Sequence, residues 1–449
     1  MKPVFGVIIA LLIGTNCDGV RAAAPDTPAA NERVTLIYAG RLLAFPGQPP
    51  LTRQTVVVRD GLIVELRSGY TPAAAFANPT EIIDLSHQFV LPGLMDMHTH
   101  VTHVLDRPRP ARIADEFTLS PAASALRASV SLHRILETGF TTIRDLGAPP
   151  EVIFPLRDAL NSGEIEGPRL FAAGELLSVT GGHGDDALVL PIFKEVTPEI
   201  SRPCDGVADC RRKTRDRIQL GADYIKIATS GSASDANGAA DADPDIFPDE
   251  LEAIVQTAAL HKVPVAAHVT STKAINLSVS FGVHTIEHGT YADAESFRLM
   301  KTKGAILVPT TYVVDFLDSP QIQAGLKPRE WEALSAAMKA SRALPGKAYR
   351  AGVELAVGTD AGGEASARRW RELALYVESG VPASEAIKAA TINAADVIGM
   401  QDKLGQIRGG FLADIIATPG DPLADIAALA NVDFVMKGGK VIRTPPQTQ

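Results

Sequence analysis

A short apolar run leads directly into two histidines that are separated by a single residue. Residues 91–100 read LPGLMDMHTH, so His98 and His100 follow a predicted strand. Residues i and i+2 of a strand project to the same face, and both imidazoles can therefore reach one point. Neutral imidazole is the commonest side-chain ligand of metals near physiological pH. The pair favours a metal site, with two surface histidines as the alternative.

Further polar residues follow short apolar runs later in the chain. They are Lys226, His268, His288 and Asp360. The strands of a parallel barrel end at one rim, so all of these side chains would converge there. All except the lysine are ordinary ligands of divalent metals, and with the histidine pair they exceed the three protein ligands of a single catalytic zinc. The set predicts two divalent metal ions, with zinc expected and manganese or cobalt left open.

Lys226 differs from the other members of this set because an ammonium group would be repelled by bound cations. Burial and nearby positive charge lower the pKa of a lysine. A neutral amine can add carbon dioxide and become a carbamate, an anion that is able to bridge two metals. The alternative is a lysine that pairs with a carboxylate at the end of a strand.

Short apolar strands alternate with helical patterns over the middle of the chain, which is typical of a parallel sheet with crossover helices. The strand candidates are 93–97, 141–144, 170–173, 224–227, 263–267, 285–286, 306–308 and 355–357. The helical patterns are 122–136, 150–160, 210–220, 248–261, 272–279, 292–303 and 328–351. These units predict an α/β fold, a (β/α)8 TIM barrel. A doubly wound open sheet is the alternative, although no Gly-x-Gly-x-x-Gly follows the first strand.

Both ends of the chain have the pattern of β structure. Residues 34–90 contain strand-like runs with a hairpin signal at Arg59-Asp60-Gly61. Residues 413–442 contain another strand and then the order strand, glycine turn, strand. We therefore expect one small β-sandwich composed of residues 33–91 and 398–445, and a barrel domain of residues 92–397.

In order and in inferred strand position, these polar residues resemble the metal ligands of the amidohydrolase superfamily in its binuclear form. The resemblance covers almost the whole mature chain. Within that superfamily the chain is most similar to the imidazolonepropionase-like branch, which includes Xaa-Pro dipeptidases, related carboxypeptidases and ochratoxin-degrading amidases. The local matches are Thr180-Gly181-Gly182-His183-Gly184, the segment IKIATSGS at 225–232, and Asp421-Pro422-Leu423.

The resemblance implies a role for each ligand. The metal set comprises His98, His100, Lys226, His268, His288 and Asp360. The first two histidines and Asp360 would hold a buried metal, the last two histidines a more exposed one, and carboxylated Lys226 would bridge them. True imidazolonepropionases and deaminases use one metal and lack the lysine of the fourth strand, so Lys226 argues against those activities.

These residues imply hydrolytic chemistry. Two divalent cations lower the pKa of a bridging water and give a hydroxide near neutral pH, and one of them polarises the scissile carbonyl. Asp360 would act as general base and then as general acid. His183, in a glycine-rich loop, would stabilise the oxyanion or contact the substrate, unless it is a solvated loop residue. Tyr312 and His103 are further candidates for substrate contact, with packing at the rim and loop placement as alternatives.

Composition and the first residues restrict the class of protein. The 449 residues carry a formal net charge of −9 and no basic run, which argues against a nucleic-acid binder. Residues 1–24 have one lysine, an apolar run and small residues at the end, which predicts a cleaved signal peptide and an exported, periplasmic or secreted protein. The run is too short to span a bilayer, and an interfacial anchor is the alternative.

Two cysteines remain when Cys17 is removed with the signal peptide. Cys204 and Cys210 are close in sequence, and in an oxidising compartment such a pair can form a disulfide that closes a small loop. Few metal-ligating residues surround them, so a zinc site is disfavoured. We expect a disulfide.

The sequence thus predicts a metal-dependent hydrolase of C–N bonds that acts on a small-molecule amide, either an N-acyl amino acid or a dipeptide. Ochratoxin-type amides are included by resemblance, and a homo-oligomer is expected on the same ground. The alternatives are a lactonase or phosphotriesterase, a mononuclear imidazolonepropionase-like hydrolase, and a binding paralogue without catalysis.

Overall fold

The computed structural model describes residues 33–103, 118–185, 203–233, 238–363 and 367–445. The predicted signal peptide, residues 1–24, lies outside the described residues. Among the helices within those ranges, none combines the length and the apolar character that a membrane span requires.

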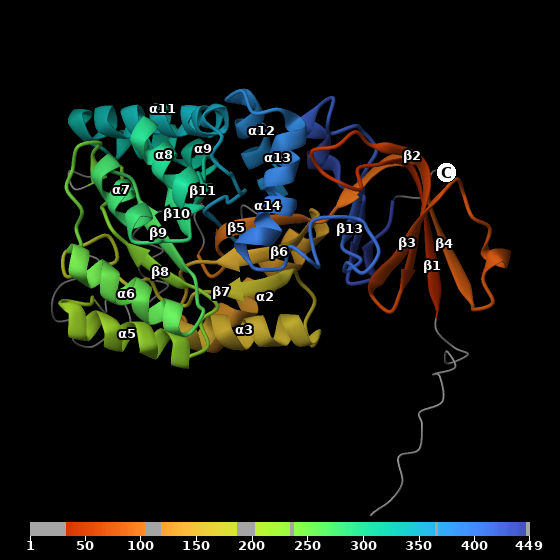
Figure 1. Cartoon of the computed structure of the whole chain (residues 1–449), viewed down its shortest axis with the longest axis horizontal. Helices are drawn as coiled ribbons and strands as arrows, with labels where there is room; N and C mark the ends of the chain where they lie inside the picture. Colours follow the sequence, from red (N-terminus) through yellow and green to blue (C-terminus); the bar gives the residue numbers. More distant parts are fainter. Residues whose placement is uncertain (1–32, 104–117, 186–202, 234–237, 364–366, 446–449) are drawn as a thin grey trace, which may run out of the picture.

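Strands from both ends of the chain pair in one seven-stranded sheet, which lies at one end of the molecule in Figure 1. Its order is β15-β14-β13-β4-β1-β2-β3. The first four strands in sequence are β1 (Val34–Leu42), β2 (Leu51–Arg59), β3 (Leu62–Ser68) and β4 (Thr80–Pro92), and the last three are β13 (Ile415–Thr418), β14 (Phe434–Lys437) and β15 (Lys440–Arg443). Because β4 pairs with β1 on one side and β13 on the other, it joins the two ends of the chain.

The predicted hairpin at Arg59-Asp60-Gly61 is confirmed. Asp60 and Gly61 turn the chain between β2 and β3 with φ values of 51° and 79°, as a two-residue hairpin turn requires. A Cβ atom on Gly61 would lie 2.8 Å from the carbonyl oxygen of Gly438. The tip of this hairpin therefore packs closely against the turn between β14 and β15.

The middle of the chain forms two four-stranded parallel sheets with orders β12-β5-β6-β7 and β11-β10-β9-β8. The strands of the first are β5 (Leu94–His100), β6 (Phe140–Asp145), β7 (Arg169–Ala172) and β12 (Ala361–Gly362), and those of the second are β8 (Ile225–Ala228), β9 (Val265–Val269), β10 (Thr285–His288) and β11 (Ile306–Val308). The prediction of an α/β fold with parallel strands is confirmed.

The last predicted strand, 355–357, differs from the expectation. It is not a regular strand but is bonded on both sides, since Ala356 N donates to Leu307 O at 3.0 Å and Met97 N donates to Val357 O at 2.8 Å. A second contact lies at the opposite edges of the sheets, where Leu177 forms an isolated parallel bridge with Ile227. The two sheets are therefore hydrogen-bonded to each other through irregular segments.

Helices follow most of the parallel strands and cover their outer side (Figure 1). They are α2 (Pro121–Glu137), α3 (Pro150–Ser162), α5 (Val207–Gln219), α6 (Pro248–Leu260), α7 (Thr272–Ser280), α8 (Ala294–Lys303), α9 (Val313–Leu317), α10 (Pro320–Ala324), α11 (Pro328–Ala351), α12 (Arg371–Glu378), α13 (Ala383–Ala389) and α14 (Ile392–Val397). Short 3-10 helices occupy Ala73–Ala75 and Ile426–Asn431.

The helix α2 illustrates why these segments are helical. Ser120 caps its first turn by accepting from Ala123 N at 3.2 Å, and Pro121 occupies the first helical position. Its buried residues recur at helical spacing and form one apolar stripe. They are Ala128, Leu132, Ile135 and Leu136. This stripe packs into the large core between the helices and the parallel strands.

The predicted disulfide is confirmed. Cys204 and Cys210 are bonded, and both side chains are completely buried. Their loop leads into α5, whose first turn contains Cys210.

The seven-stranded sheet has its own apolar interior, in which Phe434 is completely buried. We expect Phe434→Ala to lower the free energy of unfolding by about 3–5 kcal/mol, because it removes a large side chain that the surrounding sheet cannot replace. Urea denaturation followed by circular dichroism measures the change. Val64→Ala is the matched control, since Val64 lies on β3 with 45% of its surface exposed. Equal midpoints for the two variants would contradict the assignment of this interior as a stabilising core.

Candidate metal centre

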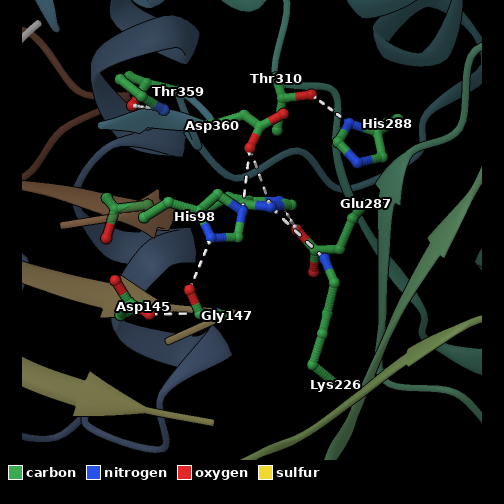
Figure 2. A network of polar contacts seen from close by, with 12 residues as sticks. His98, Asp145, Gly147, Lys226, Glu287, His288, Thr310, Thr359 and Asp360 are labelled. Carbon is green, nitrogen blue, oxygen red and sulfur yellow. Dashed lines mark hydrogen bonds and ion pairs between the residues drawn. The ribbon is translucent and has the colours of Figure 1, made fainter. Parts of the chain in front are cut away.

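The two histidines of the His-x-His segment meet Asp360 at the end of β5. The Nε2 atom of His100 lies 3.1 Å from Asp360 Oδ1, and the Nε2 atom of His98 lies 3.5 Å from the same oxygen. One ligand atom from each of these residues lies within 4.8 Å of the other two. Figure 2 shows Asp360 directed at the imidazoles.

Hydrogen bonds behind the rings fix which nitrogen of each imidazole faces Asp360. His98 Nδ1 donates to Glu287 Oε2 at 2.8 Å, and His100 Nδ1 donates to the Gly147 carbonyl at 3.1 Å. In the neutral imidazoles the proton is then on Nδ1, and the lone pair on Nε2 points at a carboxylate oxygen. Several lone pairs converge on one point, an arrangement that a proton or a cation must stabilise. The donor set fits a divalent metal ion.

Lys226 lies beside this group, on β8. Its Nζ atom is 3.4 Å from His98 Nε2, and its side chain is buried. Burial lowers the pKa of Lys226 to about 8, even though Glu287 and Asp360 act in the opposite direction. A substantial fraction of the amine is therefore neutral near physiological pH, as the addition of carbon dioxide requires.

His268 and His288 face the same space from β9 and β10. The His288 Nδ1 atom lies 2.6 Å from Thr310 Oγ1, while that hydroxyl donates to Pro309 O, so the ring donates from Nδ1 and keeps a lone pair on Nε2. The Nε2 atom of His268 is buried and has no hydrogen-bond partner within the described residues. Its ring lies edge-on to His288 with centroids 4.5 Å apart. A buried orphan nitrogen beside a second free lone pair fits another metal position.

Burial keeps most of these imidazoles neutral. It lowers the pKa of His98 and His268 well below the ordinary value, and it lowers the pKa of His288 to about 4. Asp360 is different, because the surrounding histidines overcome the effect of burial and hold its pKa far below the usual range. His100 differs from the other three, because burial acts to lower its pKa but Asp360 and Asp145 raise it overall. The site therefore combines three neutral imidazoles with a fourth that is held beside an ionised carboxylate.

The backbone is strained where these side chains leave the strands. His288, Thr310 and Asp360 have positive φ values of 67°, 53° and 54°, although none is glycine. Such conformations cost about 1–3 kcal/mol each and cluster at functional sites. At Asp360 the backbone is also held to β5, because Asp360 N donates to His98 O at 2.7 Å.

A buried ion pair behind His98 was not predicted from the sequence. Glu287 bonds to His98 through one carboxylate oxygen and to Arg144 Nη2 at 2.8 Å through the other. Both Glu287 and Arg144 are completely buried, and Arg144 Nε also donates to Met97 O at 2.6 Å. A useful signal exists in the sequence, since charged residues inside apolar strands must be paired.

A second buried ion pair, between Asp96 of β5 and Arg369, ties the segment around Asp360 to that strand. Asp96 accepts from Thr359 Oγ1 at 2.6 Å and from Thr359 N at 3.0 Å. Arg369 also donates to Asp96 and to the Gly362 carbonyl, so it fastens the segment that follows Asp360 onto β5. Arg369 follows no strand and lies in no motif, and no pattern in the sequence indicates its role.

The three candidates for substrate contact differ in how far they are buried. His183 is exposed and stacks on His268 with ring centroids 3.8 Å apart. His103 stacks on His100 at 5.2 Å. Tyr312 is buried with 3% exposure and packs against Ala361 and Leu375, so it lies in the packed interior next to Asp360. Burial raises its pKa to about 12.

The sequence profile of the amidohydrolase family matches residues 89–442. The chain belongs to the amidohydrolase family. The match covers the parallel strands, every residue of the predicted metal set and the strands at the carboxyl end. Members of this family generally use metal ions, in agreement with the cluster around Asp360.

Known proteins and solved structures resemble this chain over most of its length. Ochratoxinase from Aspergillus niger is 34% identical over 441 residues, covering 92% of this chain and 87% of that protein. The crystal structure of a Xaa-Pro dipeptidase with bound methionine superposes with a TM-score of 0.81 and 32% identity, covering 91% of this chain and all of that one. The crystal structure of A. niger ochratoxinase gives a TM-score of 0.81 at 30% identity, with 92% and 96% covered.

These similarities confirm the resemblance that the motifs predicted. The protein is a hydrolase that acts on C–N bonds, and its substrate is a small molecule.

Glu287 should control metal affinity through His98. We expect Glu287→Gln to weaken metal binding about 10- to 100-fold, because an amide offers only one acceptor atom to His98 and Arg144. Competition with a fluorescent chelator measures the affinity. Glu354→Gln, an exposed position before the last strand-like segment, should bind metal as the unaltered protein does. Equal affinities for the two variants would contradict this role of Glu287.

Proposed function

We propose that this protein is an exported amidase with two divalent metal ions, which hydrolyses the amide bond of N-acyl amino acids or dipeptides. The convergence of imidazole lone pairs on Asp360, with Lys226 and an unpaired His268 nitrogen beside them, carries the proposal. The donors exceed the three protein ligands of a single catalytic zinc. Two metal ions and a carboxylated Lys226 would give every imidazole, the carboxylate and the amine a role.

The scaffold in this proposal is a closed (β/α)8 barrel of residues 92–397, joined to a small β domain of residues 33–91 and 398–445. Hydrogen bonds through Leu177 and through the segment 354–357 support closure, since they connect the two parallel sheets at opposite edges. The pairing of β4 with β13 supports a β domain built from both ends. In such a barrel the strand ends form one rim, where the polar cluster lies.

His98, His100 and Asp360 would hold one metal, and His268 and His288 the other. Lys226, carboxylated by carbon dioxide, would join the two and turn a cation into an anion. Its low pKa supports this modification. Zinc is the expected metal, and with both ions bound the site would lower the pKa of a water molecule and polarise the substrate carbonyl.

The side chains then have separate tasks. Asp360 Oδ1 faces the imidazoles, so its second oxygen, Oδ2, would take the proton of the attacking water. The same carboxyl group would then pass that proton to the leaving nitrogen. His183 lies exposed over His268, where an N–H would donate to the oxygen that gains charge. His103 would border the substrate beside His100.

The substrate class rests on the relatives. Ochratoxinase and the Xaa-Pro dipeptidase cover nearly the whole chain at 34% and 32% identity. From the substrates of these relatives we infer that the substrate of this protein is an acyl group joined to an amino acid, with ochratoxin-type amides included. Export is supported by the signal-like pattern of residues 1–24 and by the disulfide, since disulfides persist in oxidising compartments.

Metal analysis combined with an activity panel tests the proposal. We expect about two divalent ions per chain and hydrolysis of N-acyl amino acids or Xaa-Pro dipeptides. Lys226→Ala should lose metal and activity. Asp360→Asn should lower kcat by a factor of about 10²–10⁴, because it removes the proton acceptor. Elemental analysis by mass spectrometry and a chromatographic assay of the released amino acid give both quantities.

His133→Ala is the control for these variants. His133 lies on α2 and contacts Glu137 and Glu166 at the surface, so its removal should change neither metal content nor rate. About one metal per chain with an active Lys226→Ala variant would identify a mononuclear hydrolase instead. Turnover of lactones or phosphotriesters without amide cleavage would overturn the substrate class.

Reconstitution of metal-free protein should depend on bicarbonate and on pH. Protonated Lys226 cannot add carbon dioxide, and the neutral fraction grows as the pH rises through its pKa of about 8. At equal dissolved carbon dioxide, we therefore expect the rate of zinc-dependent reactivation to rise between about pH 7 and pH 9. Stopped assays after zinc addition, with and without bicarbonate, measure it. Equal rates of reactivation with and without bicarbonate would argue against a carbamate.

A further inference from the structure

The short segment Pro203–Gly206 is fastened to its surroundings at several points. The disulfide joins Cys204 to Cys210 in α5, and Cys204 N donates to Ser178 O at 2.7 Å. Lys213 donates to the carbonyl of Pro203, and Gly206 N donates to Glu250 Oε1 at 2.6 Å. The segment is therefore held by α5, by α6 and by the chain that leads into the glycine-rich loop.

Asp205, at the middle of this fastened segment, bonds to the first residue of the loop that carries His183. Its Oδ1 accepts from Thr180 N at 3.0 Å, and its Oδ2 accepts from Thr180 Oγ1 at 2.6 Å. Both carboxylate oxygens of Asp205 thus accept hydrogen bonds from the same residue, Thr180. Hydrogen bonds to an ionised acceptor are stronger than neutral ones, and two of them fix an orientation as well as a position.

The loop beyond Thr180 is compact, so its anchor determines the path of His183. Gly184 N donates to Ser178 Oγ at 3.1 Å, and Gly181 N donates to Asp185 Oδ2 at 2.9 Å. A Cβ atom on Gly182 would lie only 2.5 Å from Ser178 Oγ. These contacts tie the residues of the turn to one another and to Ser178, so the position of Thr180 influences where His183 lies.

His183 is held from its other side by weaker contacts. Its ring stacks on His268 with an interplanar angle of 8°, and its Nδ1 atom lies 3.2 Å from Ser232 Oγ. The position of the ring over His268 also depends on the path of its loop, which Asp205 bonds at Thr180 and which contacts Ser178 through Gly184.

We propose that Asp205 is a positioning residue that sets the placement of His183 over the metal cluster, and that the Cys204–Cys210 disulfide holds Asp205 in register for this task. The inference rests on the proposed function, in which His183 contacts the substrate. The disulfide is then part of the substrate site, because it defines where the carboxylate that orients the loop can lie.

The test compares single and double variants of the full chain with the best amide of the panel as the probe. Asp205→Ala should lower kcat/KM about 10- to 100-fold, because a displacement of about 1 Å at a reacting group costs up to that much. His183→Ala should lower it as far or further. The double variant should be no slower than His183→Ala alone, since Asp205 acts through His183. Metal content should stay unchanged throughout.

Hydrogen–deuterium exchange gives a readout that needs no substrate. Exchange over residues 178–185 should accelerate in Asp205→Ala and in Cys204→Ala/Cys210→Ala, while exchange in the parallel strands stays the same. Thr180→Val, which removes only the hydroxyl donor, should give a smaller effect in both assays. Asp216→Ala is the matched control, because Asp216 lies on α5 and pairs with Arg212 at the surface.

The outcomes separate this inference from the proposed function. Additive losses in Asp205→Ala and His183→Ala, or unchanged exchange over 178–185 in Asp205→Ala, would overturn the positioning role alone. Full activity of His183→Ala would overturn both the role of His183 and this inference, and it would leave the metal cluster as the seat of catalysis.

Discussion

The site depends on the direction in which each imidazole presents its lone pair. A histidine can offer one nitrogen to a metal only if the other nitrogen carries the proton and has an acceptor for it. In this protein the acceptors are supplied from behind by Glu287, by the Gly147 carbonyl and by Thr310. Each belongs to a different strand or strand end, so the orientation of the cluster is a property of the whole parallel assembly.

That requirement explains why charged residues lie inside the strands. Glu287 needs a counterion in an interior that excludes water, and Arg144 provides it. Asp96 needs another, and Arg369 provides that one. Removing one partner of such a buried pair typically costs about 3–5 kcal/mol, whereas the intact pair adds little net stability. In this site the pairs contribute geometry, because Glu287 orients His98 and Asp96 holds Thr359 beside Asp360.

Features that arise from periodicity and spacing could be predicted from the sequence. Strand and helix positions could be predicted because apolar runs and amphipathic stripes are local properties. The proximity of the six polar side chains could be predicted because they lie in or just after these runs. The last strand-like segment, 355–357, is less regular than expected, although its backbone bonds to both Leu307 and Met97. The role of Arg369 could not be predicted, because its charged partner Asp96 is distant in sequence and no pattern surrounds Arg369 itself. For Tyr312 the sequence left substrate contact and packing at the rim open, and its burial against Leu375 favours packing, which depends on tertiary contacts.

The pairing of β4 with β13 has a consequence for how the chain folds. β4 continues into β5 with only Gly93 between them. Its partner β13, however, is synthesised about 320 residues later, after the whole α/β part of the chain. Contacts of such long range form late, and a domain dominated by them folds slowly. The seven-stranded sheet therefore cannot be completed until synthesis has reached the last strands. The sheet that joins the two ends of the chain would therefore close last.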